Sequence, residues 1–161
     1  MYGNWSFSFF IQGVQGNQIF NASKIETEGM SLCANQLATV ANRWTTPGQI
    51  TNMPKATYGD FTNSLISSRF VEDGSFVRVK SVTLGYELPK LLISKLNMSR
   101  VYLYLSCENL LTFTKYSGFD PEVSVYSLGG FSNSEKNIAP GVDYGTYPQS
   151  RDFLVGLNVT F

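Results

Sequence analysis

Apolar and polar residues alternate along four segments of the chain, and the last segment shows the pattern most clearly. Between Arg151 and the end of the chain, the odd positions are all apolar: Phe153, Val155, Leu157, Val159 and Phe161. The even positions between them are mostly polar or small. Because successive side chains of a β-strand point to opposite faces, this pattern predicts a strand over 151–161 with one wholly apolar face.

Three earlier segments, 4–14, 76–88 and 99–113, show the same period of two. Within 76–88 the apolar residues change parity, since Val77 and Val79 are odd whereas Val82 and Leu84 are even. A β-bulge near Lys80 would return all of them to one face, because a bulge inserts one extra residue into a strand. All four predicted strands are longer than strands of globular proteins, which usually have about five or six residues.

The connections between the predicted strands are strongly unequal. The first two strands, and the last two, are joined by long connections, whereas residues 89–98 form a short one. Long extracellular loops alternating with short periplasmic turns are typical of an outer-membrane β-barrel. In the first long connection, Ser23 and Glu26 have the spacing of a capping box, and apolar residues follow at helical spacing as far as Trp44. These features predict a short helix that ends before Pro47 and Gly48.

Composition narrows the function classes. The 161 residues include 12 basic and 12 acidic side chains, so the chain lacks the positive charge that nucleic-acid binding requires. It has no histidine, which excludes histidine-dependent triads and histidine-ligated metal sites. Its two cysteines, Cys33 and Cys107, are too far apart in sequence to form a zinc motif. No apolar run approaches the roughly 18–20 residues of a transmembrane helix, and the first residues do not resemble a signal peptide.

Strand length favours a membrane barrel over a soluble sandwich. A tilted strand needs about ten residues to cross an apolar band of about 25 Å, and each predicted strand is long enough. Aromatic residues near the strand ends, such as Trp5, Tyr86 and Phe113, match the girdles of such barrels. Four strands are too few to close a barrel, which takes roughly eight. We therefore expect an all-β, antiparallel four-stranded piece of a larger barrel.

Candidate chemistry is sparse. Carboxylates are paired at Glu72/Asp73 and at Asp120/Glu122, and a glycosidase uses two carboxyl groups. However, Asp73-Gly74 and Asp120-Pro121 are turn signals, and no phosphate or metal motif is present. We therefore predict no catalytic, cofactor or metal site and do not expect an enzyme. Exposed aromatic residues of the predicted loops could contact a ligand or a partner, or pack the loops together: Trp44, Tyr126, Tyr144 and Tyr147.

Several stretches of the chain, in order and over nearly its whole length, resemble the SusC/RagA-type TonB-dependent outer-membrane transporters. They are GNQIFN (16–21), NRW (42–44), VEDGSFVRVK (71–80), VTLGYELP (82–89), ENLLTF (108–113), YSGFDPE (116–122), GVDYGTYP (141–148) and the terminal Phe161. The resemblance implies that residues 1–161 form the last four strands of a barrel of about 22 strands. It also implies a plug domain, a TonB-contacting segment and a signal peptide upstream of residue 1.

The same resemblance implies import of oligosaccharides or peptides across the outer membrane of a Gram-negative bacterium, together with a SusD-like surface lipoprotein. The other implied partners are the rest of the barrel and its plug, the TonB complex, outer-membrane lipid and the barrel-assembly machinery. That machinery would recognise the C-terminal strand through Phe153, Val155, Leu157, Val159 and Phe161. Two alternatives stay open, namely a structural or adhesive outer-membrane barrel that does not transport, and a soluble carbohydrate-binding β-sandwich.

Overall fold

The computed structural model describes residues 3–93, 98–123 and 141–161. The chain divides into two compact units. The first comprises Met1–Gln15, Ser75–Lys115 and Pro148–Phe161, and we call it the sheet unit. The second comprises Gly16–Gly74 and Tyr116–Tyr147, and we call it the loop unit. The two long connections between strands therefore supply one unit, and the strands supply the other.

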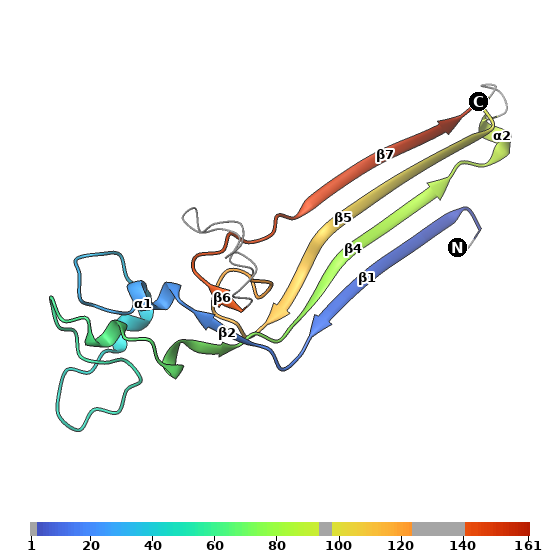
Figure 1. Cartoon of the computed structure of the whole chain (residues 1–161). Helices are drawn as coiled ribbons and strands as arrows, with labels where there is room; N and C mark the ends of the chain where they lie inside the picture. The colour runs from blue at the N-terminus through green and yellow to red at the C-terminus, as the bar shows by residue number, and fades with distance from the viewer. Residues whose placement is uncertain (1–2, 94–97, 124–140) are drawn as a thin grey trace, which may run out of the picture. The chain divides into compact units, whose positions relative to one another are not determined.

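The sheet unit contains a four-stranded antiparallel sheet (Figure 1). Its strands are β1 (Trp5–Val14), β4 (Phe76–Glu87), β5 (Arg100–Thr114) and β7 (Asp152–Thr160), and they pair in chain order. Each predicted strand is present, and each of its ends lies within one residue of the predicted end. The four-stranded antiparallel part of the predicted fold is therefore confirmed.

The predicted bulge is present at Lys80. Phe10 of β1 lies opposite Ser81, whereas the next residue, Ile11, lies opposite Val79, so the register skips Lys80. On β5 the register also shifts between the partners of Val79 and Ser81. There Asn109 has a φ of +51°, a left-handed conformation that asparagine adopts more readily than most residues. The bulge brings the apolar residues on both sides of Lys80 to one face of β4.

The apolar face runs across all four strands and is exposed. Phe7 on β1, Leu84 on β4 and Leu105 on β5 lie in register with one another, and Leu105 is paired with Val155 of β7. Phe7 is 61% exposed and Val155 is 77% exposed. A β-sandwich buries its apolar face between two sheets, so this exposure does not fit the soluble alternative.

The opposite face of the sheet is polar and hydrogen-bonded between strands. The guanidinium Nε of the buried Arg78 donates to Thr112 Oγ1 at 2.8 Å. The hydroxyl groups of Thr83 and Ser106 are also hydrogen-bonded, at 2.8 Å. Such cross-strand contacts each stabilise a sheet by a fraction of a kcal/mol, roughly, and they help to fix which residues lie opposite one another.

The loop unit is built around a second, small sheet. Strand β2 (Gln18–Asn21) lies between β3 (Val71–Asp73), which is antiparallel to it, and β6 (Val142–Asp143), which is parallel. Ile19 and Phe70 are completely buried, and the ring of Phe70 meets that of Phe20 edge-on at 6.3 Å. Residues more than 100 positions apart in sequence, such as Phe20 and Val142, are thus joined in one sheet.

The helical segments in the described part of the chain are short. In the loop unit they are α1 (Ser23–Thr27) and the 3-10 turns η1 (Ala38–Asn42), η2 (Thr62–Ser64) and η3 (Ser68–Phe70). Between β4 and β5 lies α2 (Lys90–Ile93). Among the described residues, no helix has the length and apolar character needed to cross a membrane.

The predicted helix from Ser23 to Trp44 is wrong in its extent and in its cap. Only the first turn forms, its N-cap is Ala22, and no side chain caps it. The chain turns away at Gly29 and Met30, where Met30 has a φ of +56°. A β-carbon on Gly29 would lie 2.7 Å from the carbonyl oxygen of Ile25, so this position is too tight for a side chain. Ser64 lies against this turn and donates its hydroxyl to the carbonyl of Ile25 at 3.4 Å, a contact that local spacing could not reveal.

Deleting Lys80 from the full-length protein should disrupt the sheet, because the deletion reverses the faces of one half of β4. Arg78 would then move to the apolar face, where a charged side chain costs about 2–4 kcal/mol if that face contacts lipid. The fraction of protein whose strands resist protease measures the effect. Lys80→Ala is the matched control, since it keeps the residue count and should fold. A deletion variant that folds as well as Lys80→Ala would contradict this role of the bulge.

Candidate functional site

The structure places the predicted loop aromatics in different surroundings. Trp44 is half-buried, and its backbone N–H donates to the carbonyl of Met53 at 3.1 Å. The hydroxyl of Tyr144 donates to Glu26 Oε1 at 2.5 Å, whereas Tyr147 is 85% exposed. These three rings make no aromatic contact with one another, and Tyr126 lies outside the described residues. The hydroxyl of Tyr144 thus joins its loop to α1, and Tyr147 is exposed.

Glu72, on β3, is a polar centre of the loop unit. Lys24 Nζ lies 2.8 Å from its carboxylate, and Asn21 Nδ2 donates to it at 3.0 Å. The backbone N–H and hydroxyl of Ser117 donate to it at 3.0 and 2.9 Å. One carboxylate therefore joins β2, β3, the first turn of α1 and the segment that follows β5.

The hydrogen bonds around Glu72 change its acidity. Burial by itself raises the pKa of this carboxyl group, but hydrogen bonds from Lys24, Ser117 and Asn21 act in the opposite direction and outweigh it. The pKa of Glu72 therefore lies below its ordinary value, and the group stays ionised in the folded protein.

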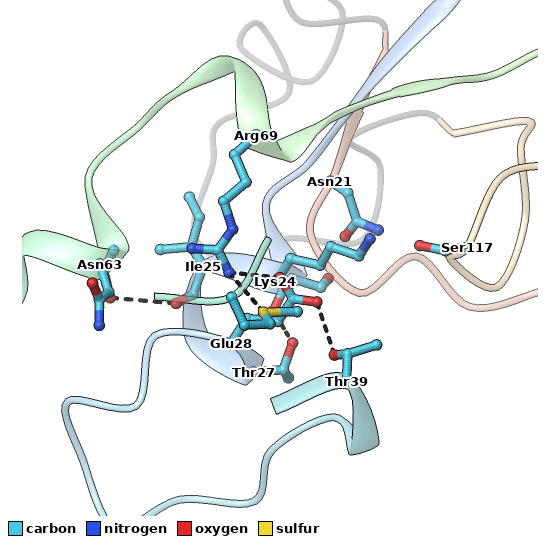
Figure 2. A network of polar contacts seen from close by, with 12 residues as sticks. Asn21, Lys24, Ile25, Thr27, Glu28, Thr39, Asn63, Arg69 and Ser117 are labelled. Carbon is cyan, nitrogen blue, oxygen red and sulfur yellow. Dashed lines mark hydrogen bonds and ion pairs between the residues drawn. The ribbon is translucent and has the colours of Figure 1, made fainter. Parts of the chain in front are cut away.

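A second carboxylate, Glu28, is almost completely buried. It lies within a network of polar contacts (Figure 2). An Arg69 guanidinium nitrogen donates to its Oε2 at 2.9 Å, and the hydroxyl of Thr39 donates to its Oε1 at 3.1 Å. The same nitrogen of Arg69 lies 3.5 Å from the sulfur of Met53. This network holds together the end of α1, the turn η1 and the segment before β3, and a buried charge of this kind needs all of its partners.

Asp143, on β6, is another buried carboxylate. The hydroxyl of Tyr116 donates to its Oδ2 at 2.5 Å, and the N–H of Thr146 donates to its Oδ1 at 2.9 Å. Burial raises the pKa of Tyr116, and the hydrogen bond to Asp143 raises it further. The hydroxyl group of Tyr116 therefore keeps its proton and donates it in this hydrogen bond. Asp143 thus ties the second long connection to the small sheet.

The carboxylate pairs noted in the sequence have structural roles. The N–H of Glu122 donates to Asp120 Oδ1 at 2.9 Å, which is the geometry of the predicted turn. Glu72 follows a different pattern, because its partners come from three separate segments. Within the described ranges, no three Cys, Asp or Glu side chains are grouped as metal ligands would be.

An open hollow of about 500 Å³ lies on the loop unit, between residues 39–42 and 49–53. Its lining is uncharged and mostly polar: Thr39, Ala41, Asn42, Gln49, Ile50, Thr51, Asn52 and Met53. Part of this polar lining holds the loop itself, since Thr51 donates to the Asn42 carbonyl at 2.5 Å and Gln49 Nε2 donates to the Arg43 carbonyl at 3.2 Å.

The residues of the predicted assembly signal lie along one face of β7. Val155, Leu157 and Val159 are paired with Leu105, Leu103 and Val101 of β5, so the apolar face of the sheet continues onto them. Phe161, directly after the strand, is 82% exposed. β7 is an outer strand of the four-stranded sheet, so it offers both an apolar face and a backbone edge to other parts of a larger protein.

Comparison with known proteins supports one class. No protein-family model matches the sequence. TonB-dependent receptor P3 of Formosa agariphila is 39% identical over 160 residues, which cover 99% of this chain and 15% of that receptor. TonB-dependent receptor SusC of Bacteroides thetaiotaomicron is 26% identical over 168 residues, which cover 99% of this chain and 14% of SusC. The chain thus spans about 15% of the length of these curated relatives.

Solved structures agree with the sequence relatives. The RagAB peptide transporter matches 98% of this chain with a TM-score of 0.75 and 27% identity, and the match covers 16% of the transporter chain. The RagAB peptide importer in its 'closed-closed' state matches the same share of this chain with a TM-score of 0.77. The long one-faced strands and these matches place the chain in the class of TonB-dependent receptors, and its relatives are receptors and transporters rather than enzymes. The chain belongs to the SusC/RagA-type TonB-dependent transporters, as the resemblance implied, and it matches a segment of them.

Replacing Glu72 with Gln should loosen the loop unit at neutral pH. Because the pKa of Glu72 is lowered by folding, its stabilising effect is present above the ordinary pKa of about 4.3 and is lost as pH falls through the lowered value. We expect a loss of about 1 kcal/mol in protection, since the Lys24 pair is partly exposed and contributes little beyond its hydrogen bonds. Amide hydrogen exchange of residues 16–74 measures this loss.

The wild type and Glu72→Gln should differ at pH 7, and the difference should shrink as the pH falls through the lowered pKa of Glu72. Glu87→Gln is the control, because Glu87 pairs with Arg100 at 3.0 Å in the sheet unit. Equal protection of residues 16–74 in Glu72→Gln and the wild type at pH 7 would rule out this role for Glu72.

Proposed function

We propose that the chain is the C-terminal barrel segment of an outer-membrane transporter that imports oligosaccharides or peptides together with a SusD-like lipoprotein. The observation that carries this proposal is the continuous, exposed apolar face of four long strands in a chain related to SusC and RagAB. In this proposal residues 1–161 are the last four strands of a barrel of about 22, and the plug and the TonB-contacting segment belong to the rest of the protein.

The chemistry of the sheet supports a lipid-facing role. Moving exposed apolar side chains such as Phe7 and Val155 from water into hydrocarbon is favourable. A sheet edge in hydrocarbon leaves backbone groups unsatisfied at several kcal/mol each, roughly, so a membrane sheet must be closed. The outer strands β1 and β7 would therefore pair with other strands of the barrel. The hydrogen-bonded polar face would line the interior, where plug and water lie.

The arrangement of connections supports an orientation for the segment. The two long connections build the loop unit, which we place outside the cell, and the short connection with α2 faces the periplasm. The loop unit would then contact the substrate or the SusD-like lipoprotein. Energy would reach the transporter through the TonB complex.

Uptake by cells that express the full-length protein tests the proposal. A labelled oligosaccharide pool and a labelled peptide pool are supplied separately, with and without an uncoupler that abolishes the proton-motive force. We expect energy-dependent uptake of one pool. Normal insertion with adhesion to surfaces and uptake of neither pool would contradict transport and favour the structural or adhesive barrel.

Among the loop aromatics, Tyr147 should affect uptake most directly, because its side chain is the most exposed of those described. Tyr147→Ala should lower uptake per inserted molecule about 5-fold or more, as expected for the loss of one aromatic contact of about 1 kcal/mol. Tyr58→Ala is a matched control, since Tyr58 is an equally exposed tyrosine of the same unit. Equal uptake by both variants and the wild type would remove Tyr147 from the contact surface.

Phe161 should affect assembly rather than transport. An apolar alternating strand with a terminal aromatic residue offers backbone bonds for affinity and alternate side chains for specificity to the barrel-assembly machinery. Deleting Phe161 should lower the amount of inserted protein, measured by surface labelling, and leave uptake per inserted molecule unchanged. Phe113→Ala is the control, because Phe113 is an exposed aromatic residue of β5 on the apolar face of the same sheet. It shows what the loss of any one exposed ring does to insertion. Normal insertion with reduced uptake would assign Phe161 a different role.

A further inference from the structure

One row of residues across the polar face of the sheet has a tyrosine between two glycines. Tyr104 of β5 lies directly opposite Gly85 of β4 on one side and Gly156 of β7 on the other. β5 lies between these two strands in the sheet (Figure 1). Gly156 is the only residue of β7 that is not exposed. Something on the polar face therefore covers this one position of an otherwise uncovered strand.

The ring of Tyr104 covers Gly156. A β-carbon at Gly156 would lie too close to the ring atoms Cζ and Cε1 of Tyr104 for any non-bonded contact, so the ring occupies the space of the missing side chain. Tyr102 covers Gly85 in the same way, through its hydroxyl group and Cζ. Its hydroxyl is also hydrogen-bonded to Ser6 Oγ at 2.7 Å, and its ring stacks on that of Tyr104 with centroids 6.0 Å apart. The two rings thus lean in opposite directions, one over β7 and the other over β4.

The contact between Tyr104 and Gly156 distinguishes registers of β7 against β5 that the alternation of apolar and polar side chains cannot distinguish. A slip of β7 by one residue would exchange its two faces, and the apolar pattern opposes it. A slip by two residues keeps every apolar side chain on the apolar face. It would, however, place Leu154 or Asn158 opposite Tyr104, and either side chain would displace the ring. In the first of these registers Gly156 would lie opposite Tyr102, whose ring is already engaged over Gly85 and with Ser6.

We propose that Tyr104 and Gly156 set the register in which β7 pairs with β5 when the barrel assembles. This inference rests on the proposed function as a barrel segment, in which β7 is added to a growing sheet. Tyr104 is here a positioning residue. It selects the pairing of the last strand because its ring fits only over a glycine. On the other side, the space over Gly85 of β4 is already occupied by Tyr102.

Disulfide cross-links between β5 and β7 report the register in the full-length protein. Only residues directly opposite each other bring their Cα atoms within the reach of a disulfide. In a background of Cys33→Ser and Cys107→Ser, the pair Ser106→Cys/Leu154→Cys reports the observed register. The pairs Ser106→Cys/Asp152→Cys and Glu108→Cys/Leu154→Cys report the two slips. Yields are measured on membrane-inserted molecules only.

Tyr104→Ala should lower the yield of the native cross-link by about three- to fivefold, the effect expected for the loss of one cross-strand aromatic contact. A slipped cross-link should then become detectable. Gly156→Ala should have the same effect, since its methyl group displaces the ring. Tyr104→Phe keeps the ring and should keep the native register. Gly13→Ala is the matched control, because a β-carbon there meets its nearest atoms at 3.6 Å and fits.

Exclusive native cross-linking in both Tyr104→Ala and Gly156→Ala would overturn the proposal. If Gly156→Ala does not insert, the cross-links of Tyr104→Ala decide the question. Uptake is read separately in the same cells. Absence of uptake in the wild type, combined with the expected cross-links, would contradict the transport function and leave the register inference standing.

Discussion

The sheet depends on one constraint, which is that four long strands must present all of their apolar side chains on the same face. Strand β4 meets this constraint only because the register skips Lys80, so that Val77 and Val79 lie on the same face as Val82 and Leu84. The bulge also leaves Arg78 on the polar face, where it is buried and donates to Thr112. One extra residue therefore decides both the apolar surface of the sheet and the hydrogen bonding of its other face.

The loop unit is stabilised in a different way, because its small sheet has only a few apolar residues to bury. Ile19 and Phe70 form a core that is completely buried, but the segments around them are joined by the carboxylates of Glu28, Glu72 and Asp143. Each carboxylate accepts hydrogen bonds from a segment distant in sequence, so losing one partner would leave a partly or fully buried charge. Tyr144 is held separately, by a hydrogen bond from its hydroxyl to Glu26, and Tyr147 is exposed.

The strands and the bulge could be predicted because their signal is local. Alternation with a period of two, and the change of parity at Lys80, are both visible within a dozen residues. The helix to Trp44 was wrongly predicted because Gly29 and Met30 turn the chain toward residues around Ser64, a contact that no local pattern encodes. The role of Glu72 could not be predicted either, since Ser117, 45 residues away, completes its hydrogen bonding. Family resemblance supplied the functional class, whereas individual contacts required the structure.

The alternation of side chains determines the face of a strand but not its register, and the two must be specified separately. For an interior strand such as β5, partners on both sides restrict the pairing. For β7, which has one partner in this sheet and whose residues are nearly all exposed, a slip by two residues loses backbone hydrogen bonds only at the strand ends. Unpaired backbone groups at the strand ends are costly in hydrocarbon. This cost, however, applies only once the whole strand has paired. A side-chain contact in the middle of the strand acts earlier, and the glycine at position 156, covered by Tyr104, is the place where β7 makes one.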